Sequence, residues 1–303
     1  MYKIFLSIFI LFFSQNILAS QLIWFSPRDS SFLDTRAEDK RWENARKRIS
    51  VYKFYYQQIV QENPDKLCRK LSFLKNNNIQ LAVEWPAMTW IEHGVGYNVE
   101  GFSPKGFSKK ISEKVHKCNT KIDYVAMDEP LFFGHVSNKG NVPKYSVSKV
   151  ASEVAINLKE VWEIFPEAKV GDIEPIDQLG ENYASLLKEW IVEFKKETGH
   201  DLNFIHNDVI WADNWQQSTS DLIEIGSLMN VRIGVIFNAE NGQGPDSVWM
   251  TSSRKNIDRY FDSKISLPDD IIFQSWNRYP NNISNDLDKN SHSSIIEYFS
   301  SKR

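Results

Sequence analysis

The sequence of 303 residues has little of several features that mark common classes of protein. Its formal net charge is only −3, so it lacks the basic face that nucleic-acid binding normally requires. Its six histidines are too few, and lie too often in loop-like stretches, to cluster at strand ends as in a metal-dependent hydrolase. No glycine-rich phosphate loop follows the first strand-like run, and no repeat, low-complexity segment or linker divides the chain. These absences argue against a nucleic-acid partner, a bound metal or cofactor, and a split into several domains.

Long apolar runs are also scarce, and the clearest one lies at the start of the chain. Lys3 precedes an apolar stretch, Ile4–Phe13, that is too short to cross a bilayer and is followed by small residues at Leu18-Ala19-Ser20. This pattern is typical of a secretory signal peptide, and no cysteine follows the stretch to carry a lipid anchor. We therefore expect residues 1–20 to be a signal peptide and residues 21–303 to be a secreted or periplasmic domain, with no membrane attachment after cleavage.

The sequence has only two cysteines, Cys68 and Cys118, and their spacing does not suit a metal site. Both lie in runs with a helical pattern. Thiols outside the cytosol tend to pair, so a disulfide between two adjacent helices is possible if the protein is exported. Two free buried thiols are the alternative.

From Gln21 onward, short apolar runs alternate with longer amphipathic ones, which is the pattern of strands joined by helical crossovers. Eight such strands with intervening helices fit a single-domain α/β protein of the (β/α)8, or TIM, barrel type. A doubly wound open sheet is the alternative, and the missing phosphate loop disfavours it. The expected strands cover Leu22–Ser26, Ile49–Tyr55, Ile79–Glu84, Ile122–Glu129, Lys169–Ile173, Leu202–His206, Arg232–Phe237 and Ile271–Gln274.

The fourth expected strand ends in two adjacent carboxylic acids, Asp128 and Glu129, followed by Pro130. Proline has no N–H to give to a sheet, so the strand should stop there. Side chains alternate along a strand, so one of the two acids should point into a site and the other into its supporting shell. An exposed turn is the alternative reading of such a triplet.

Other expected strands end in acids too, and in a barrel all these ends meet on one face. So many carboxyls suit either a metal site or hydrolysis of a glycosidic bond, which needs one protonated carboxyl and one ionised carboxylate. Two of the acids, Asp172 and Glu174, are separated by one residue and can share a side, where either can pair with Lys or Arg instead of acting. The candidate acids are Glu84, Asp128, Glu129, Asp172, Glu174, Asp208 and Glu240.

Aromatic residues are plentiful, with ten Trp, eleven Tyr and nineteen Phe. Trp85 and Trp276 directly follow expected strands, and Trp211 comes shortly after one. Because a pyranose ring presents an apolar C–H face on which an aromatic ring can stack, we expect these three to line a sugar-binding groove.

This arrangement resembles the clan of retaining (β/α)8 glycoside hydrolases with catalytic glutamates at the ends of strands four and seven. The resemblance implies that Glu129, in Met127-Asp128-Glu129-Pro130, is the acid/base and that Glu240, in Phe237-Asn238-Ala239-Glu240, is the nucleophile. It also implies a carbohydrate substrate, with Trp276 under the sugar. The similarity covers the architecture from residue 21 to the end.

One position departs from that clan, which typically has Asn before the acid/base glutamate where this chain has Asp128. An Asp-Glu pair there resembles instead the hexosaminidases that use the acetamido group of the substrate as nucleophile. In that alternative Asp128 orients the acetamido group, Glu129 is the acid and Glu240 only binds substrate. A non-catalytic carbohydrate-binding barrel is a further alternative, because one fold hosts many functions.

Overall fold

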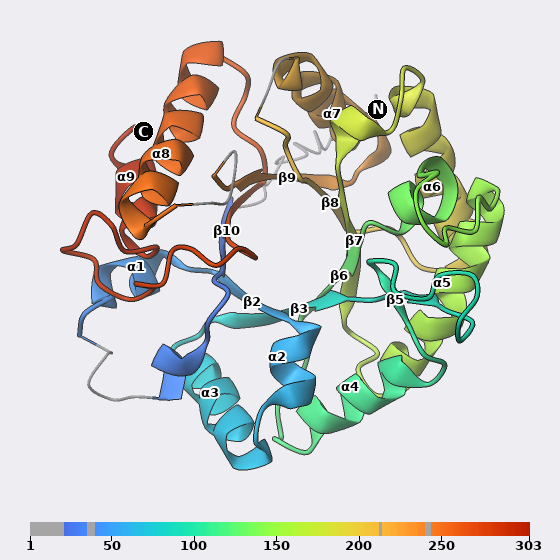
Figure 1. The fold of residues 1–303 in the computed structure, drawn as a ribbon, viewed down its shortest axis with the longest axis horizontal. Helices are drawn as coiled ribbons and strands as arrows, with labels where there is room; N and C mark the ends of the chain where they lie inside the picture. The colour runs from blue at the N-terminus through green and yellow to red at the C-terminus, as the bar shows by residue number, and fades with distance from the viewer. Residues whose placement is uncertain (1–20, 35–39, 212–213, 240–243) are drawn as a thin grey trace, which may run out of the picture.

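A computed structural model describes residues 21–34, 40–211, 214–239 and 244–303. Eight parallel strands close into a barrel in the order β1-β10-β9-β8-β7-β6-β3-β2, and helices surround it (Figure 1). The (β/α)8 barrel predicted from the sequence is therefore confirmed. The barrel strands are β1 (Leu22–Ser26), β2 (Val51–Tyr55), β3 (Gln80–Trp85), β6 (Tyr124–Asp128), β7 (Lys169–Glu174), β8 (Phe204–Asn207), β9 (Arg232–Phe237) and β10 (Asp270–Gln274).

The helices form the outer layer, and within the described residues none is long and apolar enough to cross a membrane. The first begins at Glu43. A short helix directly after β2 was not predicted. The helices are α1 (Glu43–Arg48), α2 (Tyr56–Gln61), α3 (Pro64–Asn76), α4 (Phe107–His116), α5 (Val147–Trp162), α6 (Tyr183–Thr198), α7 (Trp215–Met229), α8 (Asp246–Ser263) and α9 (Ser294–Ser300).

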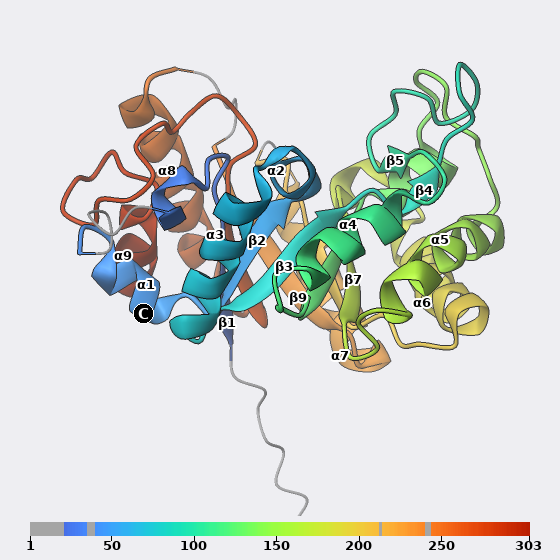
Figure 2. The same ribbon diagram turned by 90° about the horizontal axis from the view of Figure 1, so that it is seen from below.

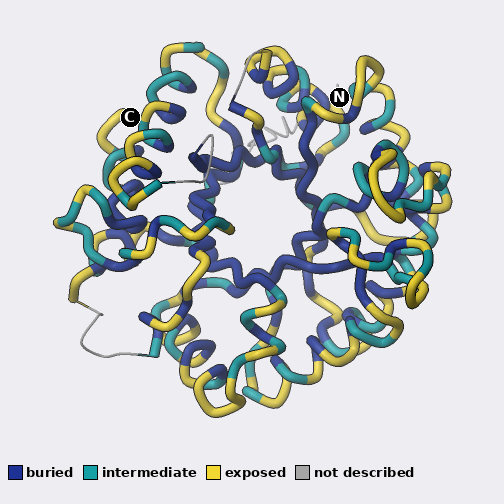
Figure 3. Tube along the Cα trace, in the orientation of Figure 1, coloured by how far each residue is buried: buried dark blue, intermediate teal, exposed yellow. Residues whose placement is uncertain are grey.

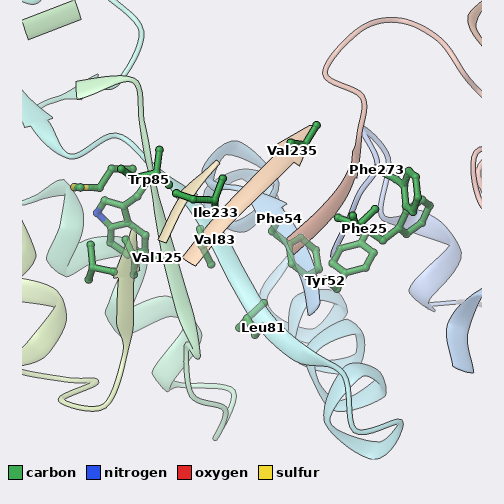
Figure 4. Packing of buried hydrophobic residues seen from close by; sticks show 14 of the residues in the cluster. Phe25, Tyr52, Phe54, Leu81, Val83, Trp85, Val125, Ile233, Val235 and Phe273 are labelled. Carbon is green, nitrogen blue, oxygen red and sulfur yellow. The ribbon is translucent and has the colours of Figure 1, made fainter. Parts of the chain in front are cut away.

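Alternation along the strands divides the apolar side chains into two cores. Outward-facing side chains such as Phe54, Val83 and Val125 pack beneath the helices (Figure 4). Burial is almost continuous along the strands, and exposed residues are found on the outer helical surfaces and loops (Figure 3). Because side chains fill the inside of the barrel, any site must lie at one of its ends. The inner core consists of Trp24, Val51, Ala82, Tyr124, Ala126, Ile173, Phe204, Ile236 and Ile272.

A disulfide joins Cys68, in α3, to Cys118, two residues after the end of α4. The two Cα atoms are 4.8 Å apart, and the bridge closes a separation of 50 residues. The predicted pairing is confirmed. The bridge ties together two helices that cover neighbouring parts of the barrel wall.

The long segment after β3 contains two short strands, β4 (Met88–Thr89) and β5 (Phe102–Ser103), which pair with each other. Their loop projects beyond the ring of helices (Figure 2). After β6 the chain turns through a π-helical segment, Phe132–Val136. Both segments follow the carboxyl ends of neighbouring barrel strands, so they border whatever site these ends form.

Candidate active site

A cleft of about 210 Å³ opens at the carboxyl ends of the barrel strands. Of the candidate residues from the sequence, Glu84, Asp128, Glu129, Asp208 and Trp276 line it. The barrel therefore gathers acids from three strand ends, up to 124 positions apart in the sequence, into one small space. The other lining residues are Tyr55, Tyr56, Gln57, Val99, Glu100, Gly101, Ile173 and Gln274.

Glu129 enters the cleft because the backbone leaves the strand conformation at this residue. Asp128 is the last residue of β6, and alternation points it into the barrel above Ala126. A continued strand would turn Glu129 outward, but its φ is +49° and its N–H donates to the carbonyl of Ile173 at 3.1 Å. Both acids therefore line the cleft, and the prediction that they point to opposite sides is wrong. A left-handed backbone at a residue with a Cβ stores about 1–2 kcal/mol of strain, a feature that is concentrated at functional sites.

Glu174 stabilises this turn from the outer side of the barrel wall, through hydrogen bonds to the backbone. Its carboxylate is buried and accepts hydrogen bonds from the backbone N–H groups of Leu131, at 2.7 Å, and Phe132, at 3.0 Å. The carboxyl of Asp172 is also buried and accepts from the indole N–H of Trp190 at 2.7 Å. Both acids face outward because Ile173, between them, points into the barrel. The prediction that Asp172 and Glu174 contact the substrate is therefore wrong, and their role is to support the wall of the site.

Two of the three predicted groove tryptophans are buried away from the cleft. Trp85 follows the inward-facing Glu84, so it faces outward, where its indole N–H donates to Ser108 at 2.9 Å. Trp211 packs on Phe237, with ring centroids 5.4 Å apart. Neither can contact a sugar in the cleft, and the prediction is wrong for both. Trp276, in contrast, lines the cleft and is 43% exposed as a residue.

Lys53, in β2, is a buried cation beneath the cleft that the sequence analysis did not select. Its ammonium is fully buried and forms an ion pair with Glu84. Gln274 also donates to Glu84, at 3.3 Å, and Asn238 donates to Asp208 at 3.3 Å. The available signal was a lysine in a strand, Val51–Tyr55, whose other residues are aliphatic or aromatic, because a buried charge in a strand requires a partner.

Glu100 was also missed, because it lies in the loop between β4 and β5 and not at a strand end. The neighbouring Gly101 has a φ of +74°, and a Cβ there would lie 2.1 Å from the carbonyl oxygen of Asp128. Only glycine allows the loop to approach the end of β6 this closely. The loop thereby carries Glu100 to the rim of the cleft.

Crowding and burial change the protonation of the acids. Burial, followed by the charges of Asp208 and Glu100, raises the pKa of Glu129 to about 9. Burial and the charge of Glu84 raise the pKa of Asp128 well above its usual range, and burial raises the pKa of Asp208 to about 7. A carboxyl with a pKa near 9 keeps its proton at neutral pH, so Glu129 is able to donate one to a leaving group.

Glu240 lies outside the described residues and stays a prediction. The strand that precedes it, β9, ends at Phe237 on the same face as β6. Among the described residues, no group of three or more His, Cys, Asp or Glu side chains is arranged to hold a metal ion.

No protein-family model and no curated protein matches the sequence. Solved structures do match it in fold. An intracellular xylanase from Thermoanaerobacterium saccharolyticum gives a TM-score of 0.52 at 14% identity, over 86% of this chain and 90% of that one. A GH10 endoxylanase retrieved from a sugarcane soil metagenome gives 0.54 at 8% identity, over 94% and 97% of the two chains. A fungal β-1,4-galactanase gives 0.55 at 10% identity, over 91% and 99%. The chain thus resembles (β/α)8 glycoside hydrolases in fold.

Proposed function

We propose that this protein is a glycoside hydrolase in which Glu129 is the general acid. The observation that carries the proposal is the position of this carboxyl in the cleft, where a left-handed backbone turns it inward from the fourth barrel strand. Burial and neighbouring acids hold its pKa near 9, so it carries the proton that a departing sugar oxygen needs. The fold shared with xylanases and a galactanase supports a carbohydrate substrate.

Two mechanisms are compatible with this acid. In the retaining mechanism Glu240 attacks the anomeric carbon and Glu129 later acts as base. In the substrate-assisted mechanism the acetamido group of the substrate attacks, and Asp128 orients it. Replacing Glu240 by Gln separates the two, since turnover is abolished in the first mechanism and only weakened in the second.

The hydrolase proposal is tested by measuring the release of reducing ends from xylan, β-1,4-galactan and chitin oligosaccharides. On the substrate that is cleaved, Glu129→Gln is expected to lower kcat/KM by roughly 10²–10⁴-fold, the usual contribution of general acid catalysis. Glu181→Gln, at an exposed position, is the matched control and should leave kcat/KM unchanged. If the wild-type protein binds oligosaccharides in the cleft without cleaving any, it is a non-catalytic carbohydrate-binding barrel.

We also propose that the protein acts outside the cytosol, with residues 1–20 as its signal peptide. The Cys68–Cys118 disulfide supports this, because such bridges persist mainly in oxidising compartments. Expression of the full chain in a bacterium, followed by cell fractionation and N-terminal sequencing, should find a protein beginning near Ser20 or Gln21 outside the cytosol. An intact N-terminus on cytosolic protein would contradict the proposal.

A further inference from the structure

We propose that the cleft selects a saccharide that carries a protonated primary amine, that is, an amino sugar that is not N-acetylated. The inference rests on the proposed function, because it assumes that the cleft is where the saccharide binds.

The charge of the cleft is the first support. Its lining includes five carboxyl groups, and no lysine or arginine is found among the described residues that line it. The buried cation beneath it, Lys53, is already paired with Glu84. Burial and mutual repulsion make it unfavourable to ionise these carboxyls together, and the raised pKa values of Asp128, Glu129 and Asp208 reflect this. A ligand ammonium stabilises the ionised carboxylates, whereas a neutral sugar does not. The five are Glu84, Glu100, Asp128, Glu129 and Asp208.

Asp128 supplies a second, independent support. Only 9% of this residue is exposed, and it faces the cleft. Among the described residues, its carboxyl has neither a hydrogen-bond donor nor an ion-pair partner. Both of its oxygens are open to the cleft, so a ligand bound there can donate hydrogen bonds to them. An ammonium group has three N–H donors and a positive charge, and it matches this carboxyl better than a hydroxyl does.

The amine also bears on the choice of mechanism. A protonated amine has no lone pair with which to attack the anomeric carbon, and it lacks the carbonyl oxygen of an acetamido group. A substrate of this class therefore requires another nucleophile, which is either a carboxylate of the protein, as proposed for Glu240 in the retaining mechanism, or a water activated by a general base. An N-acetylated substrate would agree with the substrate-assisted alternative.

The test is isothermal titration calorimetry of the protein, from residue 21 to the end, with three tetrasaccharides: fully deacetylated chitosan tetramer, its N-acetylated counterpart and xylotetraose. The measurements are made at pH 6, where the amine is protonated, and in 20 mM NaCl. We expect the Kd for the deacetylated tetramer to be at least tenfold lower than for the other two. Equal affinities, tighter binding of the acetylated tetramer, or no binding of the deacetylated tetramer overturn the inference.

Matched variants separate a specific site from general attraction to an acidic protein. Glu100→Gln removes a carboxylate at the rim of the cleft, and Glu92→Gln removes an exposed one from the same β4–β5 loop, where its side chain is 82% exposed. The preference for the amine should fall several-fold in the first variant and stay unchanged in the second. An equal loss in both variants overturns the inference. If the protein cleaves a neutral polymer and shows no preference for the amine, the amine inference fails and the hydrolase proposal holds. If the protein binds the amine and cleaves none of the substrates, only the hydrolase proposal fails.

Discussion

Glu174 accepts a hydrogen bond from the backbone N–H of Leu131 at 2.7 Å, which fixes the turn that begins at Glu129. The pairing links the ends of two adjacent strands, β6 and β7, through a buried carboxylate. The strained backbone of Glu129 is retained because this neighbour holds the residues that follow it. The geometry of the proposed acid therefore depends on a residue that does not line the cleft.

Removing the carboxylate at position 174 should destabilise the protein. Glu174→Ala leaves the N–H groups of Leu131 and Phe132 without acceptors, and each buried unsatisfied donor costs about 1–3 kcal/mol. We expect the free energy of unfolding, measured by urea denaturation, to fall by roughly 2–4 kcal/mol. Glu174→Gln keeps one acceptor oxygen and should lose less. A Glu174→Ala variant as stable as the wild type would contradict the role given to this carboxylate.

A side chain at Gly101 should disturb the cleft through a backbone collision. Gly101→Ala places a Cβ 2.1 Å from the carbonyl oxygen of Asp128. Gly106→Ala is the matched control, because φ is +77° there and nothing lies within 4 Å of an added Cβ. Both variants should lose about 1–2 kcal/mol to backbone strain, and Gly101→Ala about 1–3 kcal/mol more to overpacking. Thermal unfolding compares them, and equal losses would show that the loop does not rest on β6.

The pH dependence of activity should report the pKa of Glu129. A general acid must be protonated, so kcat/KM should fall as the pH rises through about 9. Asp208, with a pKa raised to about 7, is ionised in this range, and its negative charge raises the pKa of Glu129. Asp208→Asn should therefore move the alkaline limb to lower pH, by on the order of one unit. Asp201→Asn, on the exposed surface, should not move it. An alkaline limb that stays in place in Asp208→Asn would contradict this coupling.

The disulfide should contribute substantially to stability. Cys68 and Cys118 are 50 residues apart, and the chain-entropy relation gives about 4 kcal/mol for a loop of that length. Reduction by dithiothreitol should lower the midpoint of thermal unfolding of the wild type. The double variant Cys68→Ala and Cys118→Ala should have a lower midpoint from the outset, with no further response to the reductant. If reduction leaves the wild-type midpoint unchanged, the bridge does not constrain the unfolded chain.

Sequence patterns predicted the barrel well because strand alternation and strand spacing are local properties. The predicted bounds of β1 and β9 agree with the structure. Trp85 was wrongly predicted to line the groove, although alternation from the inward-facing Glu84 places it outside the barrel, where it is buried. The inward turn of Glu129 was not predictable, since it depends on a single left-handed residue held by Glu174, 45 positions later.

The position of Glu100 at the cleft could not be predicted from the local sequence either. It reaches the cleft only because the β4–β5 loop folds back over the end of β6, a contact between segments with no shared periodicity. The buried ion pair of Lys53 could have been predicted from the sequence, because a lysine among Tyr52, Phe54 and Tyr55 is a local signal of one.

The most direct test of the central claim compares two leaving groups in Glu129→Gln. An oligosaccharide leaves as an alkoxide unless an acid protonates it, whereas dinitrophenolate leaves without a proton. On the oligosaccharide that the wild type cleaves fastest, kcat/KM should fall by roughly 10²-fold or more. On the dinitrophenyl glycoside of the same sugar, kcat/KM should stay within about tenfold of the wild type, because it reports departure of the leaving group, which needs no general acid there, and not the later step in which Glu129 acts as base. Equal losses on the two substrates, or no loss on the oligosaccharide, would contradict the assignment of Glu129 as the proton donor.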